Sequence, residues 1–302
     1  MAIRIGIITV RGPDYHPNRR LLEAACAAGH RGFLIHPYHL WPENSAGRLG
    51  TTGENASALP HVVLPRQGAQ IGDACLALIR QFQLMGMPLV NPVEAVTIAR
   101  NKFLTQQVLT AAGLPCPDTV FVNEMPGFFH AVDRLGGYPV VVKQVSERQG
   151  DGVLRIMDPE DARQRALPAL DRHRGLMVQR YLRPDDRRDI RALVIGGELI
   201  CAAAIDPARG DFRANFHLGG RIRPMTLAGE LGQTAVRAAT VVGCDVAGVD
   251  MMVDGEGQPF IVEVNYSPGF KGMEAASGLD IAGRIVRFAA DRYHESQQRT
   301  DI

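Results

Sequence analysis

The chain contains the stretch Val246-Ala-Gly-Val-Asp-Met-Met-Val253, then Asp-Gly-Glu-Gly-Gln-Pro, then Phe260-Ile-Val-Glu-Val-Asn265, a pattern that predicts a β-hairpin. If Val253 pairs with Phe260 across the turn, Asp250 lies opposite Glu263, and Asn265 shares the face of Glu263 because side chains alternate along a strand. Two carboxylates and an amide that converge in apolar surroundings require a cation between them. Hard oxygen ligands of this kind suit Mg²⁺. A hairpin whose acidic residues face water is the alternative for this segment taken alone.

Lysine is rare in this chain, which has 33 Lys plus Arg residues but lysine at positions 102, 143 and 271 only. Lys143 ends the β-branched run Tyr138-Pro-Val-Val-Val-Lys143, which predicts a buried strand, and the sequence Arg148-Gln-Gly-Asp-Gly152 follows. A glycine-rich loop behind a strand lets backbone N–H groups approach phosphate, and an ammonium beside it adds a compact charge. A plain hairpin turn is the alternative for this loop.

Lys102 lies in the stretch 94–112, which predicts one helix ended by Gly113 at its C′ position, with Pro115 beyond. On its own, Lys102 is equally consistent with an ordinary solvated lysine on the surface of that helix. The hypothesis that it serves a ligand therefore depends on the motifs that surround it.

The composition indicates a globular intracellular protein. The 302 residues are 46% hydrophobic and 22% charged, which is enough for two or three cores. A formal net charge of +1 argues against direct binding of nucleic acid. The five scattered cysteines contain no Cys-x-x-Cys pair, which indicates reduced thiols and a cytoplasmic location. No apolar run reaches the roughly 18 residues of a membrane span, so we expect no membrane partner.

The first third of the chain predicts a β-α-β opening to a parallel sheet. We expect strands at 3–10, 32–36 and 61–64, helices at 18–28 and 73–85, and a loop at 42–59. The chain has neither a Gly-x-Gly-x-x-Gly nor a Gly-x4-Gly-Lys-Ser/Thr motif, which disfavours Rossmann dinucleotide binding and P-loop chemistry. We expect an N-terminal domain at 1–91, a central lobe at 92–182, a C-terminal lobe with the metal site at 183–296, and a tail at 297–302.

In their order and spacing, these motifs resemble the ATP-grasp superfamily and, within it, the RimK-like glutamate ligases. The resemblance covers nearly the whole chain. It is carried by Ala99-Arg-Asn-Lys102, PVVVKQVSERQGDGV around Lys143, MVQRYL at 177–182, Asp189-Ile-Arg191, GDFRANFHLGG at 210–220, AGVDMMV around Asp250, and EVNYSPGFKGMEAASGLDIAG at 263–283. It implies an α/β ATP-grasp fold of three lobes, in which an N-terminal parallel-sheet (pre-ATP-grasp) domain precedes two α+β lobes that clamp ATP.

The resemblance also implies site residues, with ATP and Mg²⁺ (or Mn²⁺) as cofactors. Of the residues implied to contact the nucleotide, Lys102 and Lys143 bind phosphates, and Gln149, Gly150, Asp151 and Gly152 form a flap over them. The backbone of Gln179, Arg180 and Tyr181 contacts adenine, and Asp189 binds the ribose. The implied metal ligands are Asp250, Glu263 and Asn265. The implied catalytic residues are Arg213 and Asn215 together with Lys143, and Arg191 is a candidate to grip a carboxylate. Taken alone, 176–178 is also consistent with simple core and Asp189 with a salt bridge to a neighbouring arginine.

The function that the resemblance implies is an ADP-forming ligase. A substrate carboxylate attacks the γ-phosphate of ATP, and an amine then attacks the acylphosphate to leave an amide. The favoured amine is glutamate and the favoured acceptor is the C-terminus of a protein or peptide, with a small-subunit ribosomal protein as the implied case and a homo-oligomer as the implied assembly. One alternative is a ligase that makes short peptides or modifies a cofactor or carrier protein. An alternative of another class is a nucleotide-binding regulatory protein without ligase activity.

Three places depart from the RimK-like pattern. Arg180 stands where an acidic residue is common, Ser146-Glu-Arg148 replaces a smaller start to the flap, and Leu218 stands where a basic residue is frequent. Because the implied contact of residues 179–181 with adenine is made mostly by backbone, we expect ATP binding to tolerate Arg180. We expect the missing basic side chain at Leu218 to alter which amino acid or acceptor is used.

Overall fold

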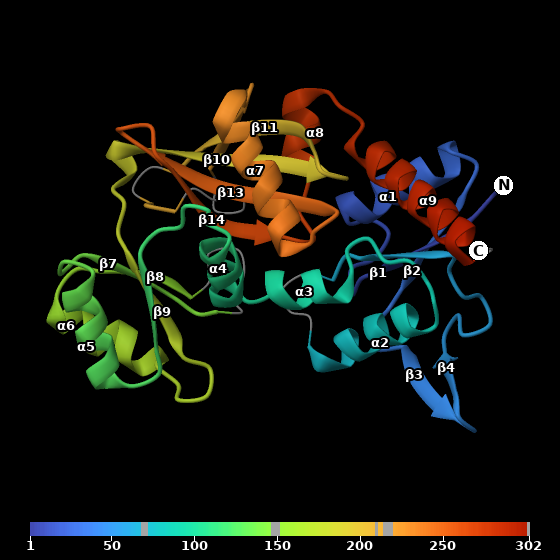
Figure 1. Cartoon of the computed structure of the whole chain (residues 1–302), viewed down its shortest axis with the longest axis horizontal. Helices are drawn as coiled ribbons and strands as arrows, with labels where there is room; N and C mark the ends of the chain where they lie inside the picture. The colour runs from blue at the N-terminus through green and yellow to red at the C-terminus, as the bar shows by residue number, and fades with distance from the viewer. Residues whose placement is uncertain (68–71, 146–151, 209–210, 214–219, 301–302) are drawn as a thin grey trace.

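The computed structural model describes residues 1–67, 72–145, 152–208, 211–213 and 220–300. The chain forms an N-terminal domain, a central lobe and a C-terminal lobe (Figure 1). The C-terminal lobe lies above the other two in this view, and both chain ends lie at the side of the N-terminal domain. Within the described residues, no helix has the length and apolar character needed to cross a bilayer.

The N-terminal domain contains the predicted parallel sheet. Its strands are β1 (Arg4–Ile8), β2 (Arg31–Ile35) and β5 (Val62–Pro65), in the order β2-β1-β5, and its helices are α1 (His16–Ala27) and α2 (Asp73–Leu84). Ile5, Ile7 and Ile8 of β1 are completely buried, as expected for the central strand of a parallel sheet covered on both faces.

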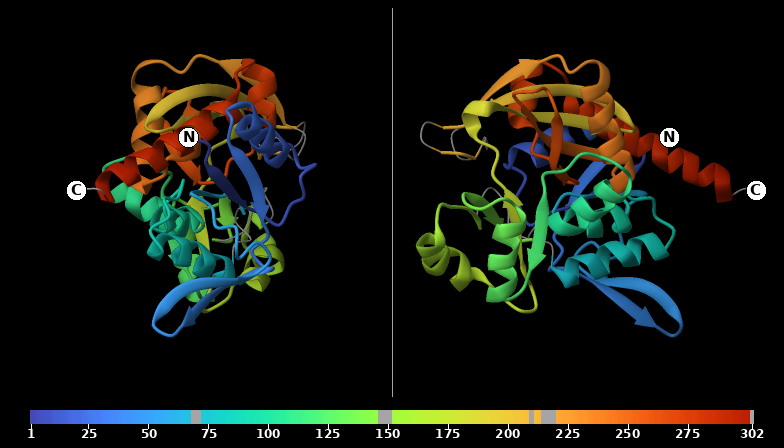
Figure 2. Two further views of the ribbon diagram at one scale, coloured as in Figure 1. Left: turned by 90° about the vertical axis from the view of Figure 1, so that its right-hand side faces the viewer. Right: turned by 60° about the vertical axis from the view of Figure 1, so that its left-hand side comes forward.

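The segment predicted as a loop at 42–59 contains a β-hairpin, so that prediction was wrong. Strands β3 (Leu40–Ser45) and β4 (Arg48–Gly53) pair antiparallel and project from the body of the domain (Figures 1 and 2). The amide of Gln81 on α2 donates to the carbonyls of Glu43 and Gly50, both at 2.8 Å. This tertiary anchor, together with the burial of Leu40, stabilises strands whose own residues have poor strand propensity.

The single helix predicted for 94–112 is two helices, α3 (Val93–Ala99) and α4 (Lys102–Ala111). The break lies at Asn101, whose extended backbone and side-chain oxygen cap α4 by accepting from the N–H groups of Phe103 and Leu104 at 3.0 and 3.1 Å. Lys102 is therefore the first residue of a helix. Its own N–H donates to the carbonyl of Val145 at 3.0 Å, which places it beside the central lobe.

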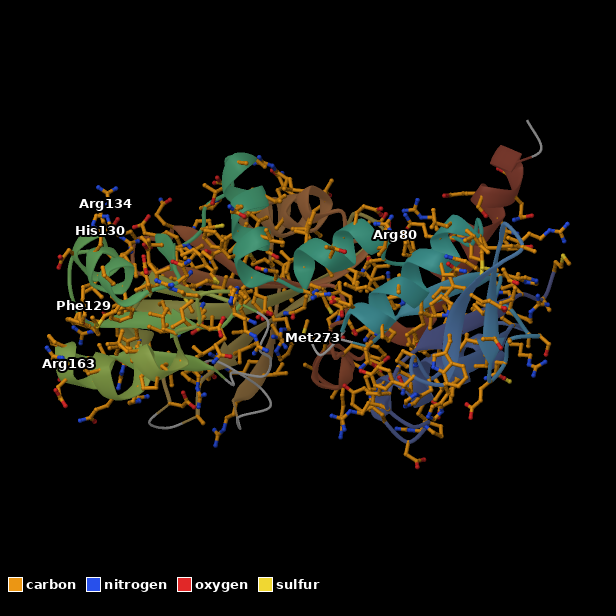
Figure 3. The ribbon with its side chains drawn as sticks, turned by 90° about the horizontal axis from the view of Figure 1, so that it is seen from below. Arg80, Phe129, His130, Arg134, Arg163 and Met273 are labelled. Atoms are coloured by element: carbon orange, nitrogen blue, oxygen red, sulfur yellow. The ribbon has the colours of Figure 1, made fainter. Side chains whose placement is uncertain are left out.

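The central lobe is an antiparallel sheet that is covered on one face. Its strands, in the order β6-β9-β7-β8, are β6 (Thr119–Val122), β7 (Val140–Lys143), β8 (Val153–Ile156) and β9 (Leu176–Arg180). Its helical elements are α5 (Met125–Arg134), α6 (Pro159–Asp161) and the short turns η1 (Ala162–Ala166) and η2 (Leu167–Ala169). Val140, Val142 and Val178 pack with Phe128 on the α5 side, so the alternate residues of the same strands face the other lobe. His130 and Arg134 on α5, and Arg163, lie at the far outer end of the lobe (Figure 3).

The C-terminal lobe is a five-stranded antiparallel sheet with helices. The strands, in the order β12-β11-β10-β13-β14, are β10 (Arg187–Ile195), β11 (Glu198–Asp206), β12 (Arg221–Met225), β13 (Val246–Asp254) and β14 (Pro259–Asn265); a short turn, η3 (Pro184–Asp186), precedes them. The helices are α7 (Gly229–Val242), α8 (Lys271–Ser277) and α9 (Ile281–Thr300). Helix α9 packs on α1, and its Ile285 and Val286 share a core with Ile5 of β1. The predicted tail at 297–302 thus begins inside α9.

Asn91 joins the N-terminal domain to the hairpin of β13 and β14. Its buried side chain donates to the carbonyls of Val246 and Tyr266, both at 2.8 Å, and accepts from the N–H of Val246 at 2.7 Å. Three buried backbone groups, at the start of β13 and just after β14, therefore depend on one amide.

Asn91→Ala should lower the free energy of unfolding by about 3 kcal/mol, because it leaves those three buried backbone groups unpaired. Asn123→Ala is the matched control, since the exposed Asn123 makes one 3.4 Å bond to the carbonyl of Arg172, and it should change stability by less than about 0.5 kcal/mol. Urea unfolding followed by circular dichroism measures both. Equal effects of the two variants would contradict the assigned role of Asn91.

Candidate active site

A cavity of about 210 Å³ lies between the exposed face of the central sheet and the C-terminal sheet, with Tyr15 of the N-terminal domain at its wall. Among the described residues, it is lined by six cations and three carboxylates: Lys102, Lys143, Arg180, Arg187, Arg191 and Arg213, and Asp189, Asp250 and Glu263. Every predicted site residue in the described part of the chain lines it, except Gly152 and Tyr181. The excess of positive charge suits an anionic ligand.

The hairpin of β13 and β14 brings Asp250 opposite Glu263, as predicted. The register at the turn differs from the prediction, because Phe260 pairs with Met252 and Val253 pairs with Pro259. A bulge after Asp250 restores the expected pairing toward the cavity. The predicted geometry of the two carboxylates therefore holds although the predicted turn register was wrong by one residue.

Four charged side chains lie in a row along one side of the cavity. Arg191 of β10 is the cross-strand neighbour of Asp250, which is the neighbour of Glu263, and Lys102 of α4 reaches Glu263 Oε1 with its Nζ at 3.7 Å. We call Arg191, Asp250, Glu263 and Lys102 the charge row. Two carboxylates are adjacent in it, and a cation stands at each end.

The pair of Arg191 and Asp250 is bidentate. Nε of Arg191 donates to Oδ1 of Asp250 and Nη2 donates to Oδ2, both at 2.6 Å, and the amide of Asn265 approaches the same Oδ2 at 3.4 Å. Burial opposes the charge on Arg191, but the charge and hydrogen bonds of Asp250, with a smaller effect of Glu263, outweigh it and raise the pKa of Arg191. The cation expected beside the carboxylates is thus supplied in part by the protein.

Lys143 is buried at the end of β7, on the face opposite the core of the central lobe. Its Nζ donates to Oε1 of Gln179 at 2.7 Å, and the amide of Gln179 donates to the hydroxyl of Thr119 at 2.8 Å. Burial lowers the pKa of Lys143 to about 8; Glu263 acts in the opposite direction, and Lys102 lowers it further. The side chain of Lys102 is also largely enclosed, with 11% of it exposed, so it is not a solvated helix lysine.

Asp189 pairs with Arg187, one of the neighbouring arginines expected as partners if Asp189 forms a salt bridge. Nε of Arg187 donates to Oδ2 of Asp189 at 3.1 Å, and its other nitrogens donate to the carbonyls of Leu182 and of Phe212, the latter at 2.7 Å. Burial raises the pKa of Asp189, and the charge and hydrogen bond of Arg187 partly offset that effect. Asp189 lines the cavity while taking part in a salt bridge, so the two interpretations of this residue are compatible.

Arg213 is held by Asp211 and faces the cavity. Its Nε and Nη2 donate to the carboxylate of Asp211, with distances of 3.0 Å to Oδ1 and 2.8 Å to Oδ2, and the hydrogen bond from Arg213 is the largest cause that lowers the pKa of Asp211. Four predicted site residues lie outside the described residues: Gln149, Gly150, Asp151 and Asn215. Gly152 is described, and its carbonyl accepts from the N–H of Gln144 at 3.2 Å.

The end of β9 forms the wall at which adenine contacts were expected. Gln179 points its side chain to Lys143, and the N–H of Arg180 donates to the carbonyl of Asp118 at 2.9 Å. The guanidinium of Arg180 lies 5.6 Å from the ring centre of Phe260 and 3.6 Å from the carboxylate of Asp118. Tyr181 turns away from the cavity, toward Arg155.

Residues missed by the sequence analysis come from segments distant in the chain. Tyr15 reaches the cavity from the start of α1, and Phe212 lines it next to the predicted residue Arg213. Arg187 could not be distinguished from the other arginines of 183–191, because nothing in their spacing tells which one becomes buried.

Among the described residues, no three His, Cys, Asp or Glu side chains cluster as a metal site, and the predicted set has two carboxylates and one amide.

Comparison with known protein families accounts for both parts of the chain. Residues 3–96 match the RimK PreATP-grasp domain, and residues 99–289 match the RimK-like ATP-grasp domain. The chain belongs to the RimK-like ATP-grasp family. The predicted ATP-grasp fold, with a parallel-sheet pre-ATP-grasp domain before two antiparallel-sheet lobes, is confirmed, as is the prediction of an ATP-grasp ligase.

Curated relatives of this RimK-like chain share its full length. It is 34% identical over 304 residues to "Probable alpha-L-glutamate ligase 1" of Shewanella amazonensis, which covers 99% of both chains. It is 35% identical over 288 residues to "Probable alpha-L-glutamate ligase" of Teredinibacter turnerae, with 95% of both chains covered. These similarities place the chain among relatives named as glutamate ligases.

Solved structures share the fold at lower identity. The ATP-grasp ligase PsnB in complex with a minimal precursor superposes with a TM-score of 0.74 at 21% identity, over 97% of this chain and 100% of that chain. D-alanine–D-alanine ligase from Bacillus anthracis complexed with ATP gives a TM-score of 0.70 at 17% identity, over 99% and 100% of the two chains. At these identities the likeness shows the fold alone.

The ionisation of Lys143 should make stability depend on pH. Its pKa of about 8 in the folded protein lies below its ordinary value of 10.5, so the folded state loses this proton before the unfolded chain does. The free energy of unfolding should therefore rise between about pH 8 and 10.5, by roughly 3 kcal/mol relative to Lys143→Met, and the two proteins should run parallel below pH 8. Urea unfolding of both proteins across pH 7 to about 10.5 measures this. A constant difference would contradict the assigned environment of Lys143.

Proposed function

We propose that this chain is an ATP-dependent ligase that joins the amine of glutamate to the C-terminal carboxyl group of a protein or peptide. The observation that carries the proposal is the cavity between the two antiparallel sheets, in which the charge row faces Lys143 and Arg213. The names of the curated relatives, probable alpha-L-glutamate ligases, support glutamate as the amino acid.

The lining of the cavity suggests which end takes which part of ATP. The apolar side chains of Val141, Val153 and Leu182 lie in the wall near the end of β9 and suit a flat base. Lys102 and Lys143 lie between that wall and the hairpin of β13 and β14, where phosphates would find two ammonium groups. Bound phosphate would favour the charged form of Lys143, which burial otherwise disfavours.

The donor set of the hairpin fits a divalent cation. Asp250 and Glu263 are paired across the strands, and Asn265 lies beside Asp250, so three hard oxygen donors meet at one end of the cavity. Mg²⁺, or Mn²⁺, would be held by these three residues and would neutralise oxygens of the phosphates. PsnB has been solved with Mg and ADP, which supports the same pairing of metal and nucleotide here.

The reaction that we propose has two steps. The acceptor carboxylate attacks the γ-phosphorus, and the bond between that phosphorus and the β,γ-bridging oxygen breaks. ADP departs, and the acceptor becomes an acylphosphate. The amine of glutamate then attacks the acyl carbon, inorganic phosphate leaves, and the amine loses a proton to give the amide. Because nucleophile and phosphate are both anions, Lys143 and Arg213 reduce their repulsion and stabilise charge on the phosphoryl group as it transfers.

Arg191 has a double role in this proposal. Its bidentate pair uses Nε and Nη2 to hold the carboxylate of Asp250 in a fixed orientation. Nη1 is the nitrogen that can meet a substrate carboxylate, so the planar fork can serve both groups at once. The bidentate grip on a substrate carboxylate that was predicted for Arg191 stays a prediction, since the bidentate partner in the structure is Asp250.

Glu263→Gln should reduce ADP formation by about a hundredfold or more, because it removes one carboxylate of the proposed metal site and about 3 kcal/mol of transition-state stabilisation. Glu256→Gln, at the exposed turn of the same hairpin, is the matched control and should retain wild-type turnover. Coupled-enzyme detection of ADP, with circular dichroism to verify folding, measures both variants. Wild-type turnover in folded Glu263→Gln would refute the metal assignment.

The wild-type protein should release ADP faster with L-glutamate than with L-alanine, L-lysine or D-alanine when a peptide with a free C-terminus is present. Product mass should increase by one glutamyl residue at that C-terminus. Faster release by about tenfold with a neutral or basic amino acid would leave ligase chemistry intact and refute the choice of glutamate, a ratio that corresponds to about 1.4 kcal/mol. Absence of ADP release with every amino acid and acceptor would contradict the proposed function.

A further inference from the structure

Phe212 is clamped at the edge of the cavity by arginines from two lobes. Its carbonyl accepts from Nη2 of Arg187 at 2.7 Å, and its ring centre lies 5.6 Å from the guanidinium carbon of Arg155. Phe212 lines the cavity, whereas Arg155 lies behind it. The backbone and the ring of this residue are thus held by separate groups.

Arg155 also contacts Tyr181. Its guanidinium carbon lies 5.6 Å from the ring centre of Tyr181, and its Nη1 donates to the tyrosine hydroxyl at 3.1 Å. The rings of Tyr181 and Phe212 meet edge to face at 6.1 Å. Arg155, Tyr181 and Phe212 therefore form one cation–aromatic cluster, which we call the clasp.

The clasp joins three segments around the cavity. Arg155 belongs to β8 of the central lobe, Tyr181 follows β9, and Phe212 follows β11 of the C-terminal lobe. A cation over an aromatic face is attracted by the ring, and removal of water strengthens the attraction. The clasp therefore favours one relative position of the segments that it joins.

Arg213, the next residue after Phe212, depends on the same ring. Its guanidinium carbon lies 6.0 Å from the ring centre of Phe212, so the ring contacts a cation from each lobe. Asp211, which precedes Phe212 in the chain, accepts a hydrogen bond from the guanidinium of Arg213. A shift of the Phe212 ring would therefore move Arg213 relative to the phosphates that it is proposed to meet.

We propose that Arg155 is a positioning residue for phosphoryl transfer, which acts through the ring of Phe212 to place Arg213 at the cavity. This inference rests on the proposed function, because it assigns Arg213 to the transferring phosphoryl group. Arg155 itself stays outside the cavity lining and does not touch the ligand. Its contribution is to the rate of phosphoryl transfer, with little effect on the affinity for ATP.

Arg155→Met, which keeps the apolar stem and removes the charge, should lower kcat for acceptor-dependent ADP release about tenfold and change the KM for ATP less than about twofold. Tyr181→Phe, which removes only the hydroxyl that binds Arg155, should lower kcat by a smaller factor and keeps the test valid if Arg155→Met folds poorly. Arg163→Met is the matched control, since this exposed arginine pairs with Glu160 at the outer end of the same lobe (Figure 3). It should retain wild-type kinetics.

A double-mutant cycle tests the route through Phe212. In a Phe212→Leu background, Arg155→Met should reduce kcat by less than about twofold further, because the ring that transmits its effect is absent. Independent, multiplicative losses would overturn the inference, as would an unchanged kcat in Arg155→Met or a loss confined to the KM for ATP. The mass of the wild-type product distinguishes failure of this inference from failure of the proposed function. If the wild-type protein forms the amide and the Arg155 variants keep its kcat, only the positioning role of Arg155 is refuted. If the wild-type protein forms no product, the proposed function is refuted.

Discussion

The charge row of Arg191, Asp250, Glu263 and Lys102 is the constraint on which the rest of the cavity depends. Two carboxylates in adjacent positions repel each other when water is largely removed, so each requires a cation at close range. Arg191 meets this need for Asp250 at 2.6 Å, while Lys102 lies 3.7 Å from Glu263. The tight pair fixes Asp250 in the sheet, whereas the contact between Lys102 and Glu263 is longer. The same residues thus join strands β10, β13 and β14 to helix α4 and, in the proposed function, hold the cation that binds phosphate.

The position of the charge row is set by contacts between lobes. Asn91 ties the end of the N-terminal domain to the start of β13 and to Tyr266, just after β14, and the N–H of Lys102 donates to the carbonyl of Val145. Arg187 links the end of the central lobe at Leu182 to the segment at Phe212. Each contact is a hydrogen bond from a buried or half-buried polar group, and such bonds are costly to break without a replacement. These contacts therefore hold the lobes around the cavity in the arrangement that the structure shows.

Local patterns in the sequence predicted much of the site. Alternation along 246–265 placed Asp250 opposite Glu263, and the rarity of lysine drew attention to Lys102 and Lys143. The errors arose where distant segments decide the structure. The β3–β4 hairpin was missed because Gln81, on a helix about 30 residues away, stabilises it. The break between α3 and α4 is different, because Asn101 is a local N-cap signal in the sequence. The pairing of Arg191 with Asp250 joins strands separated by 59 residues, and neither strand alone indicates it.

The proposed acylphosphate is the central claim of this account, and isotope transfer tests it most directly. The acceptor peptide is prepared with oxygen-18 in its C-terminal carboxylate and is incubated with the protein, ATP, Mg²⁺ and L-glutamate. Because the attacking carboxylate oxygen stays with phosphorus when the amide forms, mass spectrometry should find one labelled oxygen in the released inorganic phosphate for each glutamyl peptide formed. Formation of the glutamyl peptide with unlabelled phosphate would contradict the account.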